Sequence, residues 1–210
     1  MIKNTLVKRL LIGPLLMAPL LMTTAAWATP QQELSTRLDK VNAFSASFAQ
    51  KVVSPEGDLL VEGEGDMAIK RPNLFRWNTL TPDENMLVSD GKTLWYYSPF
   101  IEQVTAMWLK DATEQTPFVL LTRNSDADWA NYNVDQTADT FTLTPKATNT
   151  SMGKFVLTVA KSGEVRGFSV IEQDGQRSQF TFSQFKKAEP KASMFTFVPP
   201  KGVELDDQRN

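Results

Sequence analysis

Apolar and polar residues alternate along most of this chain, and a period of two predicts half-buried β-strands. In residues 44–52, Phe44, Ala46 and Phe48 fall on one side of the predicted strand and serines lie between them. Asp90-Gly91 is a strong hairpin signal because it supplies the positive φ angles of a tight type I′ turn. The predicted strands cover residues 44–52, 59–70, 74–78, 86–89, 93–97, 100–107, 132–135, 141–144, 154–159, 165–172 and 178–185.

Two stretches have a helical period instead. In residues 30–41, Leu34, Leu38 and Val41 recur at intervals of four and three, which predicts an amphipathic helix packed on the sheet. A second, apolar helix is expected to start at Thr116-Pro117, since threonine caps helices and proline suits the first helical position. This helix is either part of the core or a lid over a cavity, and the pattern leaves both readings open.

The predicted elements form one domain that is mainly β with a few helices, an α+β class. No repeat, low-complexity run or linker interrupts the series of roughly ten strands, so we expect a single, predominantly antiparallel sheet. Open sheets of that width curl or close. Gly63 and Gly65, inside one predicted strand, favour a bulge or bend that would help the sheet to curve.

The N-terminus has the three regions of a secretory signal peptide. Lys3, Lys8 and Arg9 precede an apolar run over residues 10–22, and Ala26-Trp27-Ala28 supplies small residues at the cleavage site. We expect cleavage after Ala28 and an exported, soluble mature domain of residues 29–210. The apolar run is too short for a comfortable membrane span, which needs about 20 residues.

Composition excludes several classes of function. Without the three basic residues of the signal peptide, the chain has 19 basic and 24 acidic residues. This acidic balance and the lack of a basic block argue against binding to nucleic acid or to anionic lipid. The chain has no cysteine and no histidine, which removes thiol chemistry, Ser-His-Asp triads and ordinary zinc sites. No phosphate-binding loop or metal-ligand cluster is visible, so no cofactor is expected.

Two sets of polar residues remain as candidates. Glu62, Glu64 and Asp66 alternate along one strand, which is more typical of a solvated face than of a carboxylate hydrolase. Arg71 stands before Pro72 at the end of the same strand. Its guanidinium is either solvated or bound to backbone carbonyl oxygens of a neighbouring loop, because it has donors and no acceptor.

The segment of residues 63–100 holds an unusual number of large apolar side chains, including Phe75, Trp77 and Leu87. These side chains form either an ordinary core or the wall of a cavity for an apolar ligand. A lipid-binding module for glycolipids or free fatty acids is one function compatible with such a cavity.

Five motifs in one order resemble the LolA family of periplasmic outer-membrane lipoprotein carriers across the mature chain. They are LSTRLDKVNAFSASFAQKV, KRPNLFRW, TPDENMLVSDGKTLWYYSPFIEQVTAMWLKDAT, TPFVLL and FTFVPPKGVELDDQR. The resemblance implies a strongly curved, unclosed half-barrel covered by short helices that act as a lid. It also implies a non-enzymatic chaperone that shields lipoprotein acyl chains in an apolar cavity.

The resemblance further implies partners and site residues. The partners are triacylated outer-membrane lipoproteins, the inner-membrane ABC transporter LolCDE that loads the carrier, and the outer-membrane receptor LolB; the carrier is expected to be a monomer. Arg71 matches the family's latch arginine, which bonds the lid. The family's cavity and lid positions fall on Phe75, Leu87, Phe118 and Leu121, and we expect Trp77 to line the same cavity.

Overall fold

The computed structural model describes residues 28–112, 119–147 and 152–209. The predicted signal peptide lies almost wholly outside these residues, and so does Phe118. Among the described residues, no helix has the length and apolar character needed to cross a membrane.

One twelve-stranded sheet of the described residues forms the body of the protein, in the order β12-β6-β5-β4-β3-β2-β1-β11-β10-β9-β8-β7. All neighbours are antiparallel except β12 and β6, which are parallel. The strands are β1 (Ala43–Val53), β2 (Leu59–Lys70), β3 (Leu74–Thr81), β4 (Asn85–Asp90), β5 (Thr93–Ser98), β6 (Gln103–Trp108), β7 (Tyr132–Thr137), β8 (Thr140–Pro145), β9 (Met152–Val159), β10 (Val165–Glu172), β11 (Arg177–Lys186) and β12 (Glu204–Asp207).

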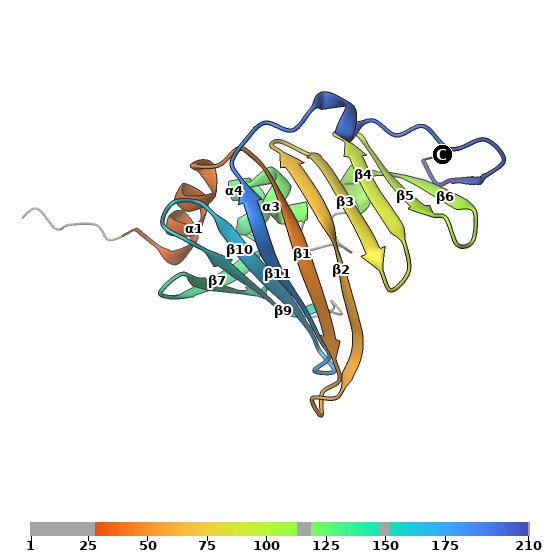
Figure 1. The fold of residues 1–210 in the computed structure, drawn as a ribbon. Helices are drawn as coiled ribbons and strands as arrows, with labels where there is room; N and C mark the ends of the chain where they lie inside the picture. The colour runs from red at the N-terminus through yellow and green to blue at the C-terminus, as the bar shows by residue number, and fades with distance from the viewer. Residues whose placement is uncertain (1–27, 113–118, 148–151, 210) are drawn as a thin grey trace, which may run out of the picture.

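The sheet consists of two meanders that meet at one seam. Strands β1 to β6 pair with their neighbours in sequence, and so do β7 to β11. The pairing of β1 with β11 joins the two halves, with Ser45 opposite Lys186 at one end and Val53 opposite Arg177 at the other. The two strands cross the middle of the sheet side by side (Figure 1).

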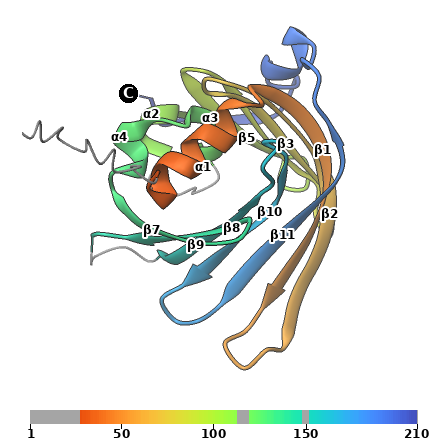
Figure 2. The ribbon, with the colours of Figure 1, turned by 90° about the vertical axis from the view of Figure 1, so that its left-hand side faces the viewer.

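Four short helices of the described chain lie inside the curve of the sheet, which remains unclosed (Figure 2). They are α1 (Pro30–Asp39), α2 (Leu109–Ala112), α3 (Val119–Arg123) and α4 (Asp126–Trp129). Thr29 begins α1 with a capping box, in which its hydroxyl accepts from the Gln32 backbone N–H and the Gln32 side chain accepts from the Thr29 N–H.

The curvature coincides with irregular pairing in β2. The register shifts between Val52 and Val53 on the β1 side and between Glu64 and Gly65 on the β3 side. A Cβ at Gly65 would lie 2.5 Å from the ring of Phe48 and would collide with the Asn78 carbonyl oxygen. Glycine is therefore required where β2 bends beneath an aromatic side chain.

One apolar cluster fills the space between the concave face and the helices. It combines side chains of α1, α2, α3 and α4 with the inward faces of both meanders. Its largest fully buried members are Trp129, Phe44, Phe75, Phe141, Phe155, Leu34, Leu38, Met67, Ile69, Leu121, Leu143 and Leu157.

The C-terminal segment covers the convex face of β3 to β6. A 3₁₀ helix, η1 (Ala192–Phe195), precedes Phe197, whose ring lies 5.7 Å from Trp95 and 5.9 Å from Tyr97 between centroids. The chain then adds β12 at the sheet edge. Arg209 pairs with Asp207 and lies over the Trp95 ring, with its Cζ 5.0 Å from the ring centroid.

The predicted fold class is confirmed, with differences in detail. The sheet has twelve strands among the described residues, because residues 204–207, which lie outside the predicted strands, form β12. The strand predicted over residues 100–107 begins only at Gln103, and Phe100 lies in the preceding turn with 85% of its surface exposed. Helices α2 and α4 were not predicted, since each is a single turn.

Candidate functional site

Phe75, Trp77 and Leu87 lie together on the concave face, where β3 pairs with β4. Alternation in β3 places Phe75 and Trp77 on the same face, and Leu87 is directly opposite Trp77. Phe75 has no exposed surface and Trp77 is 7% exposed. Leu87 is half-buried and packs against the same cluster.

Phe48 of β1 and aromatic rings from the other meander complete this wall. The Trp77 ring stacks on Phe48 at 4.2 Å between centroids, and it meets Phe180 edge-on at 5.2 Å. Phe168 packs against Phe180 at 4.6 Å. The two halves of the sheet thus share one aromatic surface across the β1–β11 seam.

The lid segment, defined here as residues 119–129 with α3 and α4, covers this surface. Leu121 is fully buried in the same cluster as Phe75. Trp129, at the end of α4, is also fully buried. The structure therefore brings Phe75, Trp77, Leu87 and Leu121 into one apolar cluster, while Phe118 lies outside the described residues.

Arg71 fastens the lid segment to α1 through backbone oxygens. Its Nε donates to the Leu121 carbonyl at 2.7 Å, and its NH1 donates to the Leu38 carbonyl at 2.8 Å and to the Val41 carbonyl. The Arg71 backbone N–H donates to the Asn42 carbonyl at 2.8 Å. The guanidinium of Arg71, which lies in the turn after β2, therefore connects this turn to α3 and to the C-terminal end of α1.

The environment of Arg71 disfavours its charge. Burial lowers the pKa of the guanidinium from its ordinary value to about 10, and the negative charge of Asp39 offsets this only in part. Among the described residues, no carboxylate pairs with Arg71, and its buried NH2 lacks a partner. Its hold on the lid segment consists of bonds to neutral oxygens.

Two further contacts hold the lid segment. The Asn73 N–H donates to the Thr122 carbonyl at 3.1 Å, directly after the Arg71 turn. Asn124 links α3 to α1, since its Nδ2 donates to the Ser35 carbonyl at 3.1 Å and to Asp39 at 2.6 Å. Its Oδ1 accepts from the Trp129 indole at 2.9 Å.

On its other side, α1 is attached to the second meander by ion pairs of Arg37. Arg37 has only 3% of its side chain exposed and pairs with Glu33 and Asp139, both at 2.7 Å. It also donates to the Val159 carbonyl at 2.8 Å. Asp139 lies between β7 and β8, so a buried ion pair ties α1 to the second meander.

Sequence reasoning identified the concave wall and Arg71, but it missed Arg37 and Asn124. Both missed residues bond across more than 80 positions of sequence, and no local pattern marks them. The carboxylates considered for hydrolysis are on the solvent side. Glu62 and Glu64 are exposed, and Glu62 pairs with Lys51 at 3.0 Å.

Comparisons with known proteins agree with this geometry. A sequence model of the family described as outer membrane lipoprotein carrier protein LolA matches residues 39–198. An outer-membrane lipoprotein carrier protein of Photobacterium profundum is 80% identical over 188 residues, which cover 90% of this chain and 94% of that protein. One from Aliivibrio salmonicida is 58% identical over 187 residues, 89% of this chain and 94% of that protein.

A solved structure supports the fold alone. The crystal structure of an uncharacterized conserved protein from Thermus thermophilus superposes with a TM-score of 0.56 at 14% identity, covering 86% of this chain and 100% of that chain. Because the family model covers most of the chain and the relatives align over nearly their full length, the chain belongs to the LolA family of outer membrane lipoprotein carrier proteins.

Proposed function

We propose that this protein is a periplasmic carrier that shields the acyl chains of triacylated outer-membrane lipoproteins against its concave apolar wall. It receives them from the inner-membrane transporter LolCDE and delivers them to the outer-membrane receptor LolB, without catalysing a reaction. The names of its relatives support the cargo, and the continuous aromatic wall under a lid of short helices supports the mode of binding.

The free energy of transfer explains why such a carrier is needed. Each buried CH₂ contributes about 0.8 kcal/mol, so acyl chains cannot cross an aqueous compartment uncovered. In the structure, Phe75 and Leu121 have no exposed surface. An acyl chain therefore gains access to this wall only when the lid segment moves away from it.

Arg71 is the proposed latch of that movement, and its contacts with the Leu121, Leu38 and Val41 carbonyls carry the proposal. Opening exchanges these bonds for bonds to water and returns a desolvated guanidinium to solvent, so the polar cost of opening is small. The apolar contacts of the lid segment must also be replaced by the cargo. Both effects keep affinity for the cargo moderate, which delivery requires.

The test compares Arg71→Leu with Arg76→Leu, in which the substituted arginine lies on the opposite face of β3 from Phe75 and Trp77. Loading of a fluorescent triacylated lipopeptide and its transfer to LolB are followed, and circular dichroism checks the fold. We expect Arg71→Leu to take up lipopeptide faster and release it several-fold more slowly, because reclosure no longer assists release. Wild-type rates for both steps would refute the latch.

The class of cargo is tested by letting two lipids compete with an apolar dye for its binding site. A triacylated lipopeptide should displace the dye at lower concentration than a free fatty acid does. Equal displacement would instead favour a general lipid-binding module.

A further inference from the structure

A hollow lies outside the aromatic wall, at the end of the sheet where the Arg71 turn meets the lid segment. It has a volume of about 280 Å³ and is lined by Asn73, Gly91, Lys92, Trp108, Leu109, Lys110 and Arg123. These residues come from the β2–β3 turn, the β4–β5 turn, the end of β6, the start of α2 and the end of α3. We call this the basic pocket.

Three cations from three separate elements surround the basic pocket. Lys92 follows the β4–β5 turn, Lys110 lies on α2 and Arg123 on α3. Asp128 pairs with Arg123 at 2.6 Å, and the Asp90 carboxylate accepts backbone N–H groups of its own turn. Within the described part of the chain, neither lysine forms an ion pair.

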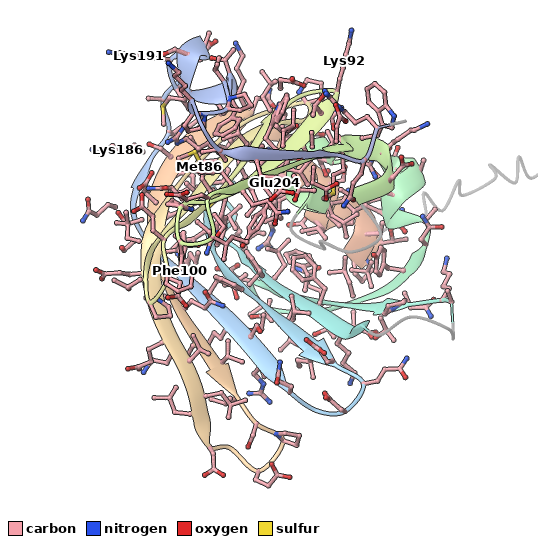
Figure 3. All side chains as sticks on the ribbon, turned by 90° about the vertical axis from the view of Figure 1, so that its right-hand side faces the viewer. Met86, Lys92, Phe100, Lys186, Lys191 and Glu204 are labelled. Atoms are coloured by element: carbon pink, nitrogen blue, oxygen red, sulfur yellow. The ribbon has the colours of Figure 1, made fainter. Side chains whose placement is uncertain are left out.

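Concentrated positive charge is unusual on this protein, whose mature chain has more acidic than basic residues. Lys92 extends from its turn into solvent (Figure 3), and Lys110 is exposed. Their flexible stems let both ammonium groups reach a ligand in the pocket. The Trp108 indole, 39% exposed, supplies an apolar side to the same hollow.

The basic pocket also has unused hydrogen-bonding capacity. Asn73 Oδ1 and Arg123 Nε are buried without partners among the described residues, and both belong to side chains that line it. An unpaired buried polar atom is unfavourable because it has lost its bonds to water. A ligand with acceptor oxygens and a donor group would satisfy both after small rotations of these side chains.

We propose that the basic pocket binds a small phosphate ester. The phosphate oxygens pair with Lys92, Lys110 and Arg123, and a hydroxyl of the ester donates to Asn73. The hollow holds one such group with a short polyol, and the overall negative charge of the mature chain favours a free anion over the surface of an anionic membrane.

The experiment uses the ¹⁵N-labelled chain of residues 29–210 and measures amide shifts during titration with inorganic phosphate or glycerol 3-phosphate at constant ionic strength. We expect saturable shifts confined to residues around Gly91, Lys110 and the Trp108 indole N–H, with tighter binding of glycerol 3-phosphate. Shifts spread over all exposed lysines, or none that saturate, would overturn the proposal.

A variant pair gives an independent readout. Lys92→Gln/Lys110→Gln should weaken binding roughly tenfold, because two of the three cations around the phosphate are lost. Lys186→Gln/Lys187→Gln, with the same charge loss on exposed lysines at the end of β11, should leave binding unchanged. Equal weakening in both pairs would refute a specific site.

Binding to vesicles distinguishes a free phosphate ester from the phosphate of a lipid headgroup. Sedimentation with phosphatidylglycerol vesicles that is lost in Lys92→Gln/Lys110→Gln, without binding of glycerol 3-phosphate, would refute a free ester and assign the pocket to a lipid headgroup.

Discussion

The ring of Phe48 stacks on the indole of Trp77 at 4.2 Å, and the two rings are accommodated because residue 65 has no side chain. Phe48 faces Gly65 directly across the β1–β2 pair. The aromatic wall therefore depends on a glycine in the strand beneath it.

Gly65→Ala should destabilise the protein by about 1–3 kcal/mol, the usual cost of overpacking. Its Cβ would lie 2.5 Å from the Phe48 ring and would also meet the Asn78 carbonyl. Urea unfolding followed by tryptophan fluorescence measures the change. Gly57→Ala is the control, since nothing lies within 4 Å of its Cβ and only its positive φ of 98° opposes alanine. A larger loss for Gly57→Ala would contradict this account.

Arg37→Met should be clearly destabilising, although by less than the roughly 3–5 kcal/mol of a fully buried pair, because Arg37 is buried while the carboxylates that lose their partner, Glu33 and Asp139, are 35% and 34% exposed. Arg166→Met serves as the comparison, since Arg166 also approaches Asp139, at 3.6 Å, but is 56% exposed. Exposed pairs contribute about 0–1 kcal/mol. Similar unfolding free energies for the two variants would show that burial of Arg37 does not matter.

The latch should be insensitive to pH between 6 and 9. Burial lowers the pKa of Arg71 to about 10, so the buried charge disfavours the folded state equally at every pH below that value. The penalty is relieved only as pH rises above about 10, toward the ordinary pKa of an arginine. The unfolding free-energy difference between wild type and Arg71→Met should therefore stay constant from pH 6 to 9. A slope across that range would require another titrating group at the latch.

The C-terminal segment should loosen only in strong acid. Bonds from Arg209 lower the pKa of Asp207 from 3.8 to about 2, so its stabilising contribution is complete above pH 3.8 and is lost as pH falls through 2. The Trp108 indole N–H, which donates to the Arg209 carbonyl at 2.9 Å, reports the change by its NMR shift. At neutral pH, Asp207→Asn should produce the same shift and Asp206→Asn should not.

Local patterns predicted most of the sheet because each strand buries one face. The alternation around Phe75 and Trp77 gave their common face, and strand β2 was predicted with its observed bounds. Strand β12 could not be predicted, since Glu204–Asp207 shows no alternation and exists through pairing with β6. Its parallel pairing is a tertiary property.

The site was predictable only in part for the same reason. Because Arg71 has only donors, the sequence predicted that it is either solvated or bonded to backbone carbonyl oxygens. Which carbonyls accept these bonds, those of Leu38, Val41 and Leu121, depends on how the helices pack. Arg37 looks like any polar residue of an amphipathic helix. Its burial follows from the position of Asp139 at the far side of the sheet.

The seam between β1 and β11 has a consequence for the order in which the sheet forms. Each meander contains mostly contacts between neighbours in sequence, which form quickly, whereas the seam must close a loop spanning most of the mature chain. Strand β1 therefore completes its pairing only after β11 has formed, and until then Phe44 and Phe48 lack their ring contacts with Phe185 and Phe180.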